Sequence, residues 1–194
     1  MIRCWNTRFR RPALVGLLSI WLSAGIAADQ NDPALDQLFL QLADTTTKVE
    51  SDRISSEIWE RWADIDDDTA RAWLDRGIQA MSNQYYREAL RSFNKVIEIA
   101  PDFAEGWNKR ATLFYLADQY DLSIDDIKQT LMLEPRHFGA LSGLGLIFIE
   151  RDNFSGALIA FREALTLNPH LTRIRHYVDR LEERQRRIDE ENAI

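Results

Sequence analysis

The histidines are the first residues whose chemistry could carry a function. The sequence holds three, at positions 137, 170 and 176, and a single cysteine, Cys4. No pair of these residues has the short spacing with which histidine and cysteine ligate zinc. The sequence therefore predicts no metal centre, no cofactor and no enzymatic activity.

Four aspartates imitate part of a calcium-binding loop. Asp64, Asp66 and Asp68 fall at its first three ligand positions, and Asp75 falls at the twelfth. Thr69 stands where such a loop needs a glycine for its turn. We interpret the segment as an acidic linker in which Asp68 or Thr69 caps the following helix.

Glycines gather at positions 139, 143 and 145, but they lack the arrangement of a phosphate-binding loop. A glycine inside a helix costs up to about 1 kcal/mol relative to alanine. Gly139 and Gly143 lie near Ser142 and Leu146 on one helix face. They predict either a shallow cleft for a peptide or tight packing against a neighbouring helix.

The first 28 residues differ from the rest of the chain. They contain four arginines and no acid, and an apolar run from Ala13 to Ile26 leads into small residues. This order is typical of a secretory signal cleaved after Ala27 or Ala28, and it predicts export to the periplasm. An inner-membrane anchor over residues 12–28 and an organelle transit peptide are the alternatives.

Net charge narrows the class of partner. The formal charge is −7, and loss of the four arginines would bring residues 29–194 to −11. An acidic surface repels phosphate backbones and anionic headgroups, which argues against nucleic acid and membrane surfaces as partners. Because Cys4 lies in the leader, the processed chain holds no thiol and suits an oxidising compartment.

An internal repeat organises the elements that must position these residues. Pro101, Pro135 and Pro169 are 34 residues apart. The same step relates small residues, which let two helices approach closely, and large residues, which fill the core. These are Gly77, Ala111 and Gly145; Ala89, Ser123 and Ala157; and Phe93, Ile127 and Phe161. Each proline should end a helix at the residue before it, namely Ala100, Glu134 or Asn168.

The pattern of Trp, Leu, Gly, Tyr, Ala, Phe and Pro resembles the tetratricopeptide repeat (TPR) family from Ala70 to about His170. Departures are Arg76, Ala80, Arg110, Ser123 and Ile127. The resemblance implies an all-α solenoid of three helical hairpins over residues 70–103, 104–137 and 138–171.

Apolar stripes flank the repeats. Those from Leu35 to Leu42 and from Ile54 to Trp62 predict, within residues 29–69, a helical pair stacked on the first repeat, with a break near Thr45 to Lys48. Residues 172–194 predict a capping helix with a polar outer face. Trp59, Trp62, Trp73 and Trp107 are expected in the core.

Members of this family bind peptides or helices on a concave surface formed by the first helix of each hairpin. The inward positions of this chain are then Arg71, Asp75, Ile78, Asn108, Lys109, Thr112, Tyr115, Ser142, Gly143, Leu146 and Ile149. Chaperone-binding members hold a terminal carboxylate with a clamp of lysine, asparagine and arginine. Here only Lys109 matches that clamp, so this activity is not expected.

The chain also resembles exported repeat proteins of Gram-negative bacteria. We therefore expect a non-catalytic adaptor of the cell envelope that binds a peptide or helix of another protein. The alternative is a structural protein that associates with itself and has no separate ligand.

Overall fold

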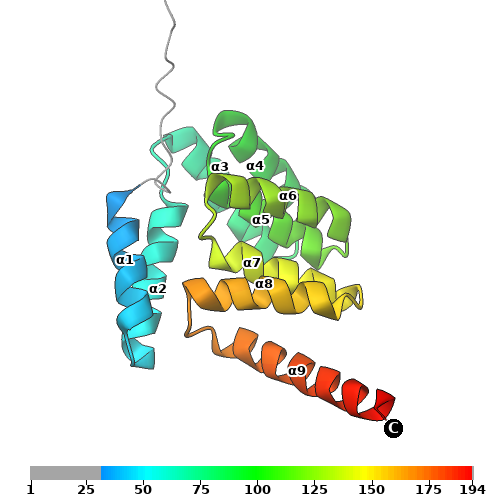
Figure 1. The fold of residues 1–194 in the computed structure, drawn as a ribbon. Coiled ribbons are helices and arrows are strands. Elements are labelled where there is room, and N and C mark those ends of the chain that lie inside the picture. The colour runs from blue at the N-terminus through cyan, green and yellow to red at the C-terminus, as the bar shows by residue number, and fades with distance from the viewer. Residues whose placement is uncertain (1–31, 194) are drawn as a thin grey trace, which may run out of the picture.

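The computed structural model describes residues 32–193 and confirms the all-α solenoid with its flanking helices (Figure 1). The expected leader, with its alternatives of cleavage and anchoring, lies outside the described residues. Within them are nine helices: α1 (Pro33–Asp44), α2 (Lys48–Ala63), α3 (Asp68–Ser82), α4 (Tyr86–Ile99), α5 (Ala104–Leu116), α6 (Tyr120–Leu133), α7 (Phe138–Glu150), α8 (Phe154–Leu167) and α9 (Thr172–Asn192).

Three helical hairpins follow one another: α3 with α4, α5 with α6, and α7 with α8. The second helices begin at Tyr86, Tyr120 and Phe154, one repeat length apart. Each ends at the residue before a repeat proline, since Ala100, Glu134 and Asn168 are the C-caps. The positions predicted to close these helices are therefore confirmed.

The turn inside each hairpin uses one left-handed residue. Gln84, Asp118 and Asp152 have φ values of 61°, 55° and 55°. The following residue donates its amide back to the first helix, as in Tyr85 N to Ala80 O at 2.8 Å, and the other two turns repeat this bond. This is the 6→1 hydrogen bond of a Schellman motif. The motif recurs in all three hairpins although none of them has a glycine at the left-handed position.

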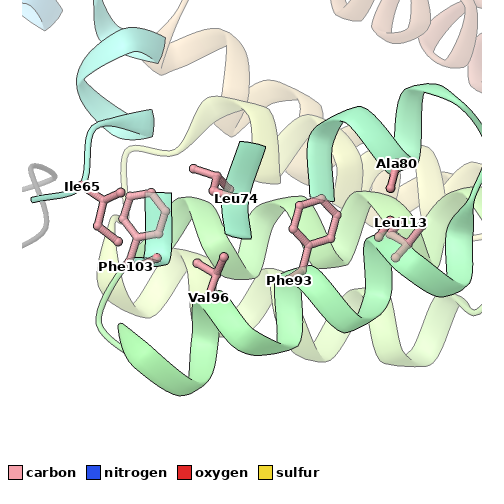
Figure 2. Close-up of a cluster of buried hydrophobic side chains, with 9 residues drawn as sticks. Ile65, Leu74, Ala80, Phe93, Val96, Phe103 and Leu113 are labelled. Atoms are coloured by element: carbon pink, nitrogen blue, oxygen red, sulfur yellow. The ribbon is translucent and has the colours of Figure 1, made fainter. Parts of the chain in front are cut away.

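Glycine and phenylalanine are matched across the first and third hairpins. A Cβ placed on Gly77 would lie 2.5 Å from Phe93 Cε1, and one on Gly145 would lie 2.3 Å from Phe161 Cε1. The middle repeat has Ala111 and Ile127 at these places, packed in one buried cluster. Its departure from the repeat pattern is thus paired: a smaller partner leaves room for alanine. Figure 2 shows Phe93 in the first-repeat core, near Leu74 and Val96.

Gly145→Ala is expected to lower the free energy of unfolding by about 1–2 kcal/mol. Overpacking a core costs about 1–3 kcal/mol. The better helix propensity of alanine offsets at most about 1 kcal/mol of this cost. Phe161 is fully buried and its ring stacks on Tyr177, so it has little freedom to move away. Chemical denaturation followed by circular dichroism measures the change.

The control for this substitution copies the middle repeat. In a Phe161→Ile background, Gly145→Ala should cost less than it does alone, because isoleucine vacates the space of the ring. A stabilising Gly145→Ala, as at an exposed helical site, would show that the contact is not tight.

The N-terminal helical pair docks elsewhere than predicted. Thr45 ends α1 and Thr47 caps α2, as the sequence indicates. The pair does not form its core with the first repeat, however. Its buried residues share one cluster with Phe138, Leu141 and Ala164 of the third repeat, and in Figure 1 the pair stands beside the stack. The reason is that the aromatic side chains of α2 pack against Phe138 of α7.

The acidic linker and the last helix complete the chain. Asp67, rather than Asp68 or Thr69, caps α3 by accepting the amide of Ala70 at 2.8 Å. α9 covers the third repeat with Ile174, Val178 and Leu181. No helix among residues 32–193 is long and apolar enough to cross a membrane.

Candidate partner-binding site

A cavity of about 460 Å³ opens between α5, α7 and the start of α9, and Trp59 of α2 also lines it. Six of the eleven predicted site residues line it, and they come from the first helices of the second and third repeats. They are Asn108, Thr112, Tyr115, Ser142, Gly143 and Leu146. We refer to this cavity as the cleft.

The surface of the cleft is mainly apolar despite its hydroxyl groups. Ser142 donates to Phe138 O at 2.7 Å, and Thr112 donates to Asn108 O at 2.9 Å. These hydrogen bonds return to the preceding turn of the same helix, so the hydroxyls are already satisfied. Ala111, Leu146 and Ile174 supply apolar walls. Such a surface suits apolar side chains of a ligand better than charged groups.

Gly139 and Gly143 of α7 have different roles. A Cβ on Gly139 would lie 2.4 Å from Cη2 of Trp59, so this glycine packs tightly against α2. A Cβ on Gly143 would meet only Ile127 Cδ1, at 3.8 Å. The sequence left two alternatives open for these glycines. Gly139 allows tight packing against a neighbouring helix, whereas Gly143 leaves space in the cleft.

The remaining predicted residues do not share the cleft. Arg71 and Asp75 line a separate polar depression between α2 and α3, where Arg71 donates to Asp64 at 2.6 Å. Ile78 packs on the core of the first repeat, and Ile149 packs on the cluster below α9. The predicted surface is therefore divided, and α2 borders both parts.

Lys109 belongs to a buried polar network that sequence analysis did not find. Its Nζ lies 2.6 Å from Oε1 of Glu105 and forms an ion pair with it, but the angles are not those of a hydrogen bond. Asn108 donates to Oε2 of Glu105 at 2.7 Å, and His137 Nε2 lies 3.0 Å from the same oxygen. Glu105 and His137 are 1% and 0% exposed, whereas the side chain of Lys109 is 25% exposed, so the carboxylate and the imidazole are desolvated and the ammonium keeps some contact with water.

The hydrogen bonds of His137 define its tautomer. Its Nδ1 accepts the amide of Ala140 at 3.1 Å, which caps α7 and requires this nitrogen to be unprotonated. Nε2 then carries the hydrogen and donates to Glu105. Both ring nitrogens are occupied, and no group of three potential metal ligands occurs in the described part of the chain.

The ionisation of Glu105 follows from these contacts. Burial by itself would raise the pKa of this carboxyl, but the hydrogen bond with His137 and the charge of Lys109 outweigh it. The pKa of Glu105 is therefore lowered from its ordinary value of 4.5. A carboxylate held in this way stabilises the folded state above that pH.

Aromatic and ionic contacts join α1 and α2 to this network. The Trp62 ring stacks on His137 with centroids 4.2 Å apart, and Trp62 Nε1 donates to Glu134 at 3.4 Å. Arg136 links Glu134, at 3.0 Å, to Asp36 of α1, at 2.6 Å. The prediction of a core role holds for Trp62, which is 2% exposed. Trp59, Trp73 and Trp107 are only partly buried.

The sequence carried weak signals for this network. Glu105 stands four residues before Lys109, a spacing that indicates an exposed helical ion pair as readily as a buried one. Glu134 precedes a proline and has the sequence context of a solvated turn. Neither signal reveals burial, because the neighbours that exclude water come from α2.

Known proteins share the repeat architecture of this chain. A family model described as Tetratricopeptide repeat matches residues 70–103. The chain is 34% identical over 161 residues to a TPR repeat-containing protein of Rhizobium etli, an alignment that covers 81% of this chain and 78% of that protein. The chain belongs to the tetratricopeptide repeat family.

Solved TPR structures share the fold. The TPR2B domain of yeast Sti1, in complex with pHsp70, superposes with a TM-score of 0.56 at 16% identity, covering 60% of this chain and 98% of that domain. The first TPR domain of Spaghetti, bound to an HSP90 peptide, gives a TM-score of 0.59 at 16% identity, covering 62% and 96%. At this identity the likeness concerns the fold alone.

Proposed function

We propose that this TPR protein is a non-catalytic adaptor of the bacterial cell envelope that binds a segment of another protein in the cleft. The observation that carries the proposal is the open apolar surface around Gly143, built by the first helices of two successive repeats. It is unusual for a helix to keep a glycine that no neighbour requires, since alanine would be more stable by about 1 kcal/mol. A ligand that needs the space accounts for it.

The TPR relatives support a protein ligand. The Sti1 and Spaghetti domains are complexed with pHsp70 and with an HSP90 peptide, respectively. A carboxylate clamp is not reproduced here, because Lys109 is paired with buried Glu105 and Trp59 covers Gly139. The proposed ligand is therefore an internal segment, peptide or helix, of its partner.

The proposed location rests on the basic, apolar and small residues of the leader. N-terminal sequencing of the protein recovered from its own cells tests this step. A chain that begins at Ala28 or Asp29 in the periplasmic fraction supports export with cleavage. An intact N-terminus in the cytoplasmic fraction contradicts the envelope assignment.

Gly143→Glu is expected to abolish partner binding, because it places a charged side chain in the cleft while removing no packing. Crosslinking in the native cells, followed by mass spectrometry, compares this variant with the wild type. Met132→Glu is the matched control: it adds the same charge on α6, at a side chain that is 75% exposed.

A protein crosslinked by the wild type and Met132→Glu, but not by Gly143→Glu, supports the adaptor. It should then bind the purified protein with the same dependence on Gly143. Identical crosslinks in all three forms contradict the proposed site. A molecular mass that rises with concentration, without a partner, favours the self-associating alternative.

A further inference from the structure

Gly139 and Gly143 of α7 indicate which side chain the cleft can accommodate. Gly139 and Gly143 are one helical turn apart and therefore face the same side, about 6 Å from each other. The ring of Trp59 rests on the bare backbone at Gly139, where a Cβ would lie 2.4 Å from Cη2 and 2.8 Å from Cζ2. We call the space over the bare backbone of such a glycine a seat. The first seat, at Gly139, is thus filled by Trp59 of the same chain.

The second seat, at Gly143, is part of the lining of the cleft. Within residues 32–193, a Cβ placed on Gly143 would meet only Ile127 Cδ1, at 3.8 Å, and Tyr115, Leu146 and Ile174 also line the cleft. Trp59 lines the same cavity. A ring placed over Gly143 would contact Trp59 and so extend the existing docking of α2 on α7 by one turn. Continuity with this intramolecular interface favours a large apolar side chain, and an aromatic one above all.

The charge beside the cleft indicates which charge a ligand should carry next to its apolar side chain. Arg173, in the first turn of α9, is the one charged residue among the described residues that line it. Its side chain is exposed, and no ion pair or hydrogen bond within residues 32–193 involves it. A guanidinium left free beside an apolar cavity is suited to a carboxylate of the ligand.

We propose that the cleft recognises a partner segment that carries an aromatic side chain next to an aspartate or glutamate. The ring occupies the seat at Gly143, and the carboxylate pairs with Arg173. This assignment rests on the proposed function and specifies its ligand: the partner is chosen by an acidic aromatic motif within its chain.

Two small probes of equal shape and opposite charge test this chemistry. Indole-3-propionate carries an aromatic ring and a carboxylate, and tryptamine carries the same ring and an ammonium group. The protein is purified in the processed form made by its own cells and titrated by NMR. Indole-3-propionate should bind with a dissociation constant on the order of 1 mM. Tryptamine should bind about two- to fivefold more weakly, the range that one exposed ion pair allows.

Variants locate the binding. Gly143→Leu fills the seat and should weaken indole-3-propionate by about tenfold or more, with folding retained because a Cβ has space there. Arg173→Gln, at an exposed position, should make the two probes equal. Equal binding of the two probes to the wild type, or full binding to Gly143→Leu, would overturn the assignment.

The outcomes separate this inference from the adaptor function. If crosslinked partners depend on Gly143 but the probes do not differ, the cleft binds proteins by another chemistry and the inference fails. If the probes differ as expected but crosslinks ignore Gly143, the acidic aromatic specificity stands and the adaptor proposal fails.

Discussion

Glu105→Ala is expected to lower the free energy of unfolding by about 3–5 kcal/mol, the cost of breaking a buried pair by removing one partner. The substitution leaves the partly buried ammonium of Lys109 and the buried Nε2 hydrogen of His137 without their carboxylate, beside the ring of Trp59. It also leaves Asn108 without its acceptor. Urea denaturation at neutral pH, followed by circular dichroism, measures the loss.

The pH dependence of the effect identifies the carboxylate charge as its cause. Because the pKa of Glu105 is lowered on folding, its contribution is fully present above the ordinary value of 4.5 and is lost as the pH falls through the folded-state pKa. Glu105→Gln keeps the shape and removes the charge. The stability difference between wild type and Glu105→Gln should therefore shrink below pH 4.5. A difference that stays constant down to about pH 3 would contradict the charged network.

Trp62→Ala is the second large expected effect, about 3–5 kcal/mol, as for other buried aromatic residues cut to alanine. Trp62 stacks on His137 and lies 5.0 Å from the ring of Phe138. Its removal takes away the centre of the contact between α2 and the third repeat. Solenoid repeats depend mainly on their neighbours, so we expect α1 and α2 to undock while the three hairpins persist.

Hydrogen exchange measured by mass spectrometry distinguishes local from global loss. In Trp62→Ala, residues 33–63 should exchange much faster, whereas α5 to α8 should change little. Trp62→Phe keeps the ring but loses the hydrogen bond to Glu134, and should cost only about 1–2 kcal/mol. Equal acceleration over the whole chain in Trp62→Ala would show that the pair and the repeats form one cooperative unit.

Local rules made the repeats predictable. The 34-residue step of the prolines, with a helix ending before each, depends on neighbours within a few residues, and the structure has these helix ends where predicted. Matched residues such as Gly145 and Phe161 lie within one hairpin, so their pairing also follows from the register. Departures such as Ile127 with Ala111 needed the packing to explain them.

The sequence by itself therefore determined the all-α class, the hairpins and the first helices that face the cleft. Only the tertiary structure decided that α2 seats Trp59 on Gly139, buries Glu105 with His137 and separates Arg71 from Gly143. The physical reason is the range of the interactions involved. Helix periodicity and proline geometry act between residues close in the chain, whereas docking depends on how two distant surfaces match in shape and charge.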